Sequence, residues 1–398
     1  MHEKIVAAVD LGTSAITAML AKKDADGRLS VIAEASTGSG GYICRGSVVD
    51  ADEIARKISD LIPLLEKKQK LKIERIYIGI GGQSVRSLEI DAYLASSDDY
   101  MADDLLPAGY EILENSTPWI IAKSTLVKSP LDDVKEKINV VPAGYIISAK
   151  ALAEAVLTPE EKKQACALLD FGAGKTTLAI YKNHALKYLI TLPFGSSLIT
   201  KDISSLKNMS EQEAENFKTT SGLAIVDDNS ESKKKQLSHA SDPIDPNRIV
   251  EARMDEILSN VDEQIKCSGY GKALTAGIVI TGGGAALQKL PEAIRNKTGY
   301  QVRVATARDD LFMPTATVDR RLEHAQVIGL LALGDENCVE IPKVDPKPVD
   351  PKIFGDDEMG KQEPRKKPDK KKSGPFRRVW NGITDAVEGS AKDLFDQQ

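Results

Sequence analysis

The 398-residue sequence predicts an α/β protein built from two related halves. From Lys4 to about Gly334, runs rich in apolar and β-branched residues alternate with amphipathic stretches of helical period, and this alternation is typical of α/β architecture. The second observation is an internal repeat, in which residues 6–20 (VAAVDLGTSAITAML) match residues 166–180 (CALLDFGAGKTTLAI) position by position. The repeat indicates that one domain has been duplicated.

Composition and charge exclude several functional classes. The chain carries 53 basic and 59 acidic residues, a formal net charge of −6, so it has no general attraction to nucleic acid or anionic lipid. Its four cysteines lie far apart without Cys-x-x-Cys spacing, which argues against a zinc cluster or a disulfide framework and fits a reducing cytosol. No stretch approaches the roughly 18 consecutive apolar residues of a membrane span, and Asp10 comes too early for a secretory signal. We therefore expect a cytoplasmic protein that binds no nucleic acid.

Each copy of the repeat carries an Asp-x-Gly turn between two β-forming runs, which predicts a β-hairpin with Asp10 or Asp170 at the end of its first strand. Glycine in such a turn lets backbone N–H groups approach a phosphate, and hydroxyl groups add further donors. Two facing aspartates would repel a phosphate unless a divalent cation lay between them, so the pair predicts a Mg²⁺-nucleotide site. The alternative is two ordinary Asp-Gly hairpin turns. The turn residues that we expect to bind phosphate are Gly12, Thr13, Ser14, Gly172 and Thr176.

Residues 172–176 (GAGKT) resemble the end of a P-loop, but the full motif fails. It requires glycine at the position of Leu169 and must open into a helix, whereas residues 177–181 (TLAIY) continue as a strand. Two interpretations of Lys175 therefore stay open, namely contact with a phosphate and a solvated lysine in a turn.

Two further segments are candidates for nucleoside binding. Residues 277–294 predict a strand, three glycines and a helix, an arrangement that would let a base or phosphate lie against the backbone at a helix N-terminus. Residues 210–218 predict a helix that begins with a capping box, on which Glu215 and Lys218 share one face and would reach the sugar and base. The alternatives are an ordinary strand-to-helix turn and a surface ion pair. The three glycines are Gly282, Gly283 and Gly284.

The sequence changes character after about Gly334. Residues 340–375 contain seven prolines among many lysines and aspartates and predict a disordered linker, and residues 227–247 predict a polar, exposed loop. In residues 376–398 apolar residues return at helical spacing with arginines at the start, which predicts an amphipathic membrane-targeting helix for anionic lipid. The alternative is a tail that docks on the protein itself or on a partner. The expected membrane-contacting residues are Phe376, Arg377, Arg378, Val379, Trp380, Ile383, Val387, Leu394 and Phe395.

Four motifs, taken in order, resemble the nucleotide site of the actin, sugar-kinase and Hsp70 superfamily. They are Asp10-Leu-Gly-Thr-Ser, Asp170-Phe-Gly-Ala-Gly-Lys-Thr, Ala214-Glu-Asn-Phe-Lys218 and Thr281-Gly-Gly-Gly284. Within this superfamily the sequence is most similar to the FtsA family of bacterial cell-division proteins, through residues 151–162, 193–195, 200–203 and 252–257 and through the linker with its amphipathic tail.

This resemblance implies a fold of duplicated actin-like (ribonuclease H-like) domains around a nucleotide cleft, with an FtsA-type inserted subdomain and a disordered C-terminal tail. It divides the chain into residues 1–81 and 146–165 (first actin-like subdomain), 82–145 (insert), 166–339 (second actin-like half), 340–375 (linker) and 376–398 (membrane-targeting helix).

The resemblance also implies site roles. Asp10 and Asp170 would organise Mg²⁺, mostly through water, and backbone amides around Gly12, Thr13, Gly172 and Gly174 would hold the phosphates of ATP. Glu215, Lys218, Gly282, Gly283 and Gly284 would contact the nucleoside.

The implied function is that of an actin-like, ATP-binding cell-division protein. It would polymerise on the cytoplasmic face of the membrane at the division site and tether the tubulin-like protein FtsZ to that membrane. Its partners would be FtsZ, further copies of itself, anionic lipid and other divisome proteins. Alternatives within the superfamily are a small-molecule kinase and a scaffold of pilus or cell-shape systems.

Three features depart from the FtsA pattern. The insert is shorter than is usual for the family, so a polymer contact that relatives make through this insert does not carry over directly to this chain. Lys175 and Thr177 stand where many members have Thr and Asp, and Ser148 stands where relatives place an acid or amide near the attacking water. Serine activates water poorly without a neighbouring base. We therefore assign no catalytic residue and expect ATP binding with slow or absent hydrolysis.

Overall fold

The computed structural model describes residues 3–88, 106, 110–114, 118–123, 138, 140–226, 245–314, 316 and 319–340. The predicted linker and membrane-targeting tail lie outside these residues, apart from Glu340, and so do residues 227–244 of the predicted polar loop. Among the helices of the described part, none has the length and apolar character needed to cross a membrane.

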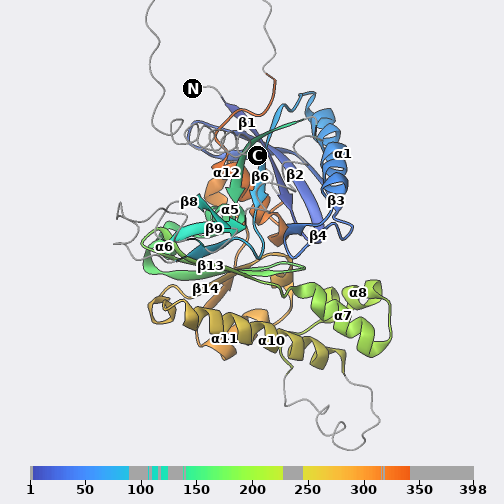
Figure 1. The fold of residues 1–398 in the computed structure, drawn as a ribbon, viewed down its shortest axis with the longest axis vertical. Coiled ribbons are helices and arrows are strands. Elements are labelled where there is room, and N and C mark those ends of the chain that lie inside the picture. Colours follow the sequence, from blue (N-terminus) through green and yellow to red (C-terminus); the bar gives the residue numbers. More distant parts are fainter. Residues whose placement is uncertain are drawn as a thin grey trace, which may run out of the picture. The chain divides into compact units, whose positions relative to one another are not determined.

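The first half contains a five-stranded sheet in the order β10-β6-β1-β2-β3 (Figure 1). Its strands are β1 (Lys4–Leu11), β2 (Ala15–Lys23), β3 (Leu29–Gly38), β6 (Arg75–Ile80) and β10 (Val141–Ile147). The strands β1, β2 and β3 are antiparallel neighbours, whereas β6 runs parallel to both β1 and β10. The apolar run from Val6 to Val9 is completely buried, as expected for a central strand covered on both faces.

The second half repeats this sheet in the order β13-β12-β11-β14-β15. Its strands are β11 (Cys166–Phe171), β12 (Thr176–Lys182), β13 (Ala185–Leu192), β14 (Ile278–Thr281) and β15 (Val302–Val304). Here too the first three strands are antiparallel neighbours, and β14 runs parallel to β11 and β15. The duplication seen in the sequence therefore extends to the order and direction of the strands, and the predicted α/β fold of two related halves is confirmed.

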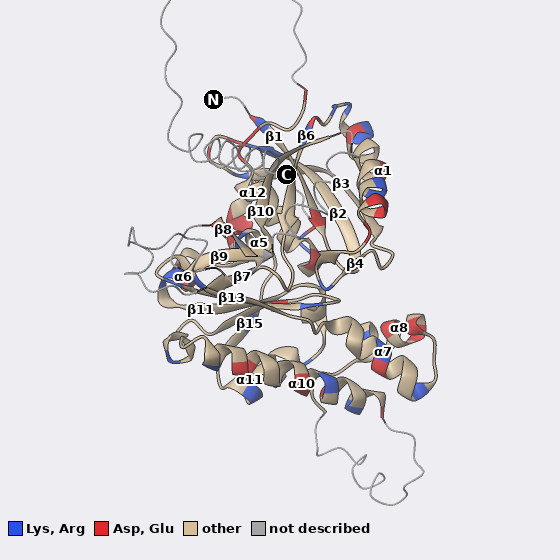
Figure 2. Cartoon of the chain, in the orientation of Figure 1, with Lys and Arg blue, Asp and Glu red and all other residues tan. Residues whose placement is uncertain are grey.

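Helix α1 (Ala51–Gln69) packs against β2 and β3 of the first sheet. It begins at Asp50, whose carboxylate accepts a hydrogen bond from the N–H of Glu53 and so caps the first turn. Its buried residues recur at helical spacing, and Figure 2 shows acidic and basic residues mixed along the rest of the helix. The buried residues are Ile54, Ala55, Ile58, Leu61, Ile62 and Leu65.

In the described part of the second half, four helices accompany the sheet. They are α7 (Ser196–Lys207), α8 (Glu211–Ser221), α10 (Pro246–Cys267) and α11 (Leu290–Thr298). Helices α10 and α11 pack together, α11 contacts β15, and α7 contacts both α8 and α10. The predicted capping box is present, because the Ser210 hydroxyl accepts from the N–H of Glu213 and the Glu213 carboxylate accepts from the N–H of Ser210. This cap fixes where α8 begins, and with it the direction of Glu215.

Two segments connect the halves. Helices α5 (Ser148–Val156) and α6 (Pro159–Gln164) lead from β10 to β11. After β15 the chain returns through the short 3₁₀ helices η4 (Asp309–Leu311) and η5 (Leu322–His324) to helix α12 (Ala325–Leu333). Because α12 packs against α5, β1 and β2, the chain ends its described part on the first half.

The range predicted for the insert holds a small separate sheet in the order β7-β9-β8. Its strands are β7 (Arg86–Leu88), β8 (Tyr110–Glu114) and β9 (Trp119–Lys123). Strand β10 begins at Val141, inside the range predicted for the insert, because it pairs with β6 in the first sheet. A two-stranded hairpin, β4 (Ile43–Cys44) and β5 (Ser47–Val48), completes the first half.

Candidate functional site

The two repeated hairpins bring their turns together. In the first turn the N–H of Gly12 donates to the carbonyl of Ala15 at 3.0 Å, and in the second the N–H of Gly172 donates to the carbonyl of Lys175 at 2.9 Å. A Cβ on Gly174 would lie only 2.6 Å from Cγ2 of Thr13, so the second turn approaches the first as closely as a glycine permits. The repeat therefore builds one site from two halves.

A cleft of about 500 Å³ lies at these turns, within the range of small-molecule sites. Most of the residues expected to bind nucleotide line it: Asp10, Gly12, Thr13, Ser14, Asp170, Gly172, Lys175, Glu215, Lys218, Gly282, Gly283 and Gly284. Gly174 does not line the cleft, because it lies against Thr13. The structure also does not bring Thr176 into the cleft, because this side chain is buried and its hydroxyl donates to the carbonyl of Phe194 at 2.7 Å.

Asp10 and Asp170 occupy equivalent places near the ends of β1 and β11. Burial raises the pKa of Asp10 to about 6; repulsion from Asp170 adds to this rise, while the charge of Lys175 and a hydrogen bond from Gln326 oppose it. Burial likewise raises the pKa of Asp170, against the charge of Lys175. Two carboxylates that are costly to ionise would be stabilised by a divalent cation, so these donors fit Mg²⁺ held directly or through water.

The cleft offers one unpaired hydroxyl donor and open backbone to a ligand. The Thr13 hydroxyl oxygen is buried and has no hydrogen-bond partner in the described part of the chain. A buried hydroxyl without a partner is unfavourable, so the free protein leaves one donor for a phosphate oxygen. A Cβ on Gly283 would meet no atom within 4 Å, so this residue faces open space in the cleft.

The glycines begin a different element from the one expected. The segment Gly283–Ala286 forms the 3₁₀ helix η3, and helix α11 begins only at Leu290. Gly282 is required by its geometry, because its φ is +85° and a Cβ there would lie 2.4 Å from Oδ1 of Asp170. The three glycines thus bring the chain against Asp170, without placing an α-helix N-terminus there.

Glu215 and Lys218 form more than a surface ion pair. The Lys218 ammonium is buried and donates to Glu215 at 2.7 Å, to the Thr200 hydroxyl at 3.0 Å and to the carbonyl of Ser196 at 3.2 Å. Burial alone would raise the pKa of Glu215, but hydrogen bonds from Lys218 and Thr200 and the charge of Lys218 outweigh it, so the pKa lies below its usual value. Glu215 is therefore a fixed carboxylate that can accept hydrogen bonds from hydroxyl groups of a ligand.

Sequence reasoning missed Gln326, which lies in the first turn of α12. Its side-chain amide donates to Oδ1 of Asp10, and it lines the cleft together with that carboxylate. The available signal was a single amide side chain in an otherwise apolar helix (AQVIGLLAL). Ser148 is buried and lines a smaller adjoining cavity with Asp170, Lys175 and Gln326.

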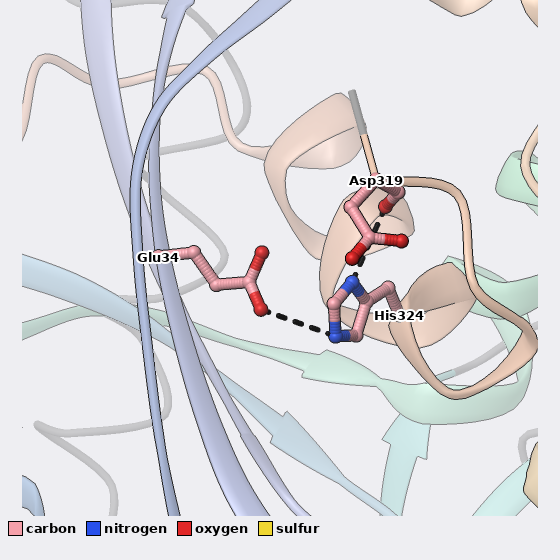
Figure 3. Close-up of side chains that lie close together, drawn as sticks. All are labelled: Glu34, Asp319 and His324. Atoms are coloured by element: carbon pink, nitrogen blue, oxygen red, sulfur yellow. Dashed lines mark hydrogen bonds and ion pairs between the residues drawn. The ribbon is translucent and has the colours of Figure 1, made fainter. Parts of the chain in front are cut away.

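A second group missed by sequence reasoning is the cluster of Glu34, Asp319 and His324 in Figure 3. Nε2 of His324 lies 3.2 Å from the Glu34 carboxylate, and Nδ1 lies 3.2 Å from the carbonyl of Asp319. The side chains are of metal-binding types, but the Arg321 guanidinium already pairs with Asp319 at 2.7 Å and with Glu34 at 3.4 Å. We interpret the cluster as an ion-pair network that joins residues 319–324 to β3.

Comparison with solved structures identifies the fold. The chain is similar to the PilM–PilN type IV pilus biogenesis complex, with a TM-score of 0.60 and 14% identity over 82% of this chain and 97% of that chain. It is also similar to MreB5 of Spiroplasma citri bound to ADP, with a TM-score of 0.51 and 13% identity over 82% of this chain and 94% of that chain. The chain therefore has the actin-like fold, as the sequence predicted.

Sequence comparison narrows this class. The family model for cell division protein FtsA matches residues 167–329. The cell division protein FtsA of Porphyromonas gingivalis (strain ATCC BAA-308 / W83) is 27% identical over 84% of this chain and 79% of its own length. The chain is therefore similar in sequence to cell division protein FtsA over most of its length, and the resemblance seen in the sequence is confirmed.

Proposed function

We propose that the protein is an ATP-binding cell-division protein that polymerises on the cytoplasmic face of the membrane and tethers FtsZ to it. The observation that carries the ATP-binding part of this proposal is the pair of opposed Asp-x-Gly hairpins around a cleft of about 500 Å³. Such a site supplies carboxylates for a cation and free donors for phosphates at one place.

ATP would lie along the cleft with its phosphates at the hairpins and its nucleoside toward α8. Thr13 and the turn amides would donate to phosphate oxygens, and Asp10 and Asp170 would hold Mg²⁺ through water, which neutralises charge on the phosphates. Glu215 would accept hydrogen bonds from the ribose, and Gly283 would lie against the base. The buried Lys218 keeps Glu215 ionised and oriented for this role.

Hydrolysis would be slow, because the groups near the terminal phosphate are poor bases. Ser148 has a hydroxyl that cannot remove a proton from water at neutral pH, and the Gln326 amide orients Asp10 without accepting a proton. We expect turnover no faster than about one per minute, a rate that orientation and electrostatics can support without a general base.

Attachment to the membrane and to FtsZ is proposed from the sequence and the homologues. The apolar stripe and the arginines of residues 376–398 form a weak anchor, since the second half of this segment is acidic. Polymerisation would place many such anchors on one surface, and multivalency would then make attachment firm. The chain's FtsA homologues are named as cell-division proteins, and a link between FtsZ and the membrane fits a protein with this tail.

Co-sedimentation with anionic liposomes, ATP and purified FtsZ tests the proposal. The full chain should carry FtsZ into the pellet, and a chain ending at Pro375 should leave both proteins in solution. A more specific test compares the variants Trp380→Asp and Asn381→Asp. Both add one negative charge, but only Trp380 lies on the apolar stripe. The proposal predicts loss of sedimentation for Trp380→Asp alone. Equal sedimentation of the full and truncated chains would refute the membrane anchor.

A further inference from the structure

Lys175 closes the second hairpin turn, and its side chain crosses from the second half of the protein to the first. Its Cδ lies 3.1 Å from the place that a Cβ on Gly46 would take, and its Nζ lies 3.3 Å from the corresponding place on Gly81. Gly46 lies between β4 and β5, and Gly81 directly follows β6. The missing side chains of these two glycines therefore provide the groove that the lysine occupies, which rules out a freely solvated turn lysine.

Lys175 is half-buried and lines both the cleft and the smaller cavity. Among the residues that the structure describes, none forms a hydrogen bond or an ion pair with its ammonium group. Its charge acts on the carboxyl groups of Asp10 and Asp170, where it partly offsets the rise in pKa that burial causes. Withdrawing a cation from water without a direct partner costs free energy. An anion that binds beside this ammonium would offset that cost.

The arrangement of the two cavities indicates which part of a nucleotide would meet Lys175. The cleft runs from Glu215 and Lys218 to the hairpin turns, whereas the smaller cavity contains Ser148 and Lys175 and is lined by neither residue of that ion pair. The Lys175 ammonium therefore stands at the end of the site that is remote from the nucleoside. A nucleotide bound with its inner phosphates on the turns would direct its last phosphate toward this end.

We propose that Lys175 selects a nucleoside triphosphate over a diphosphate by binding the terminal phosphate. This inference rests on the proposed nucleotide site and names the residue that distinguishes a bound triphosphate from a bound diphosphate. Because Lys175 belongs to the second half and its groove belongs to the first, a terminal phosphate held by it joins both halves. A diphosphate leaves the ammonium unpaired and removes that link.

The test compares the affinities of ATP, a non-hydrolysable ATP analogue and ADP for the full chain and for Lys175→Met, by equilibrium titration. The matched control is Lys201→Met, which removes an exposed lysine of α7 that does not line the cleft. Lys175→Met should weaken the two triphosphates by about 10- to 100-fold, the effect of losing one charge-assisted hydrogen bond. ADP affinity should change by less than about threefold, and Lys201→Met should change neither.

Further readouts separate failure of this inference from failure of the fold or of the site. Lys175→Met should still melt in one cooperative transition without nucleotide, because it loses no hydrogen bond and only the charge that offsets the burial of Asp10 and Asp170. Lys175→Arg should retain part of the triphosphate preference. Equal weakening of ATP and ADP, or no weakening of either, would overturn the role of Lys175 while leaving the nucleotide site intact. If the unmodified chain binds neither nucleotide, the proposed site fails and this inference fails with it.

Discussion

Gly282 and Gly283 are adjacent, yet alanine at the two positions should have different effects. Gly282 has φ +85° and ψ 161°, a region restricted essentially to glycine, and a Cβ there would lie 2.4 Å from Oδ1 of Asp170 and 2.7 Å from the carbonyl of Phe171. The backbone conformation costs roughly 1–3 kcal/mol and the overlap roughly as much again, so Gly282→Ala should lower the free energy of unfolding by about 2–6 kcal/mol.

Gly283→Ala is the matched control for the fold. A Cβ at Gly283 would meet no atom within 4 Å, so the free energy of unfolding should change by less than about 1 kcal/mol. The added methyl group would project into the cleft, and nucleotide affinity should fall by about tenfold or more. Thermal melting without ligand and titration with a fluorescent ATP analogue measure the two effects. Equal stability of the two variants, or unchanged affinity of Gly283→Ala, would refute the geometry described for this loop.

Three other predictions concern the charged groups. Because the pKa of Asp10 is raised from 3.8 to about 6, its ionisation disfavours the folded state, and stability without nucleotide should fall as pH rises from about 4 to above 6. Asp10→Asn should therefore melt higher than the unmodified protein at pH 7.5 and equally at pH 4, and equal melting at both would contradict this. Gln326→Leu removes a hydrogen bond that lowers the pKa of Asp10, so more Mg²⁺ should be needed for half-maximal ATP binding; an unchanged Mg²⁺ requirement would contradict that. Lys218→Met leaves Glu215 without its ion pair and should cost about 1–3 kcal/mol of stability by denaturant titration, whereas Lys201→Met should cost nothing measurable.

The elements that the sequence predicted well depend on local or repeated patterns. The match between residues 6–20 and 166–180 predicted both hairpins, and the observed registers pair Asp10 with Thr17 and Asp170 with Thr177. The capping box at Ser210 similarly predicted where α8 begins. These signals lie within a few residues of the structure that they determine, so no knowledge of packing was needed.

The elements that the sequence missed depend on contacts between distant segments. Gln326 reaches Asp10 across 316 positions of the chain, and no local pattern indicates that α12 returns to β1. Thr176 has the right chemistry for a phosphate, but its hydroxyl is directed to the carbonyl of Phe194. The register of the whole hairpin decides which face of the sheet a side chain occupies. A register shift of one residue moves the side chain to the opposite face.

The two repeated aspartates are expected to form one Mg²⁺-dependent nucleotide site. Equilibrium titration of a fluorescent ATP analogue into the unmodified chain and into Asp170→Asn, with Mg²⁺ and with a chelator, tests it most directly. The unmodified chain should show one saturable site whose affinity rises with Mg²⁺, and Asp170→Asn should reduce that rise by at least tenfold. Binding that is independent of Mg²⁺ and unaffected by Asp170→Asn would contradict it.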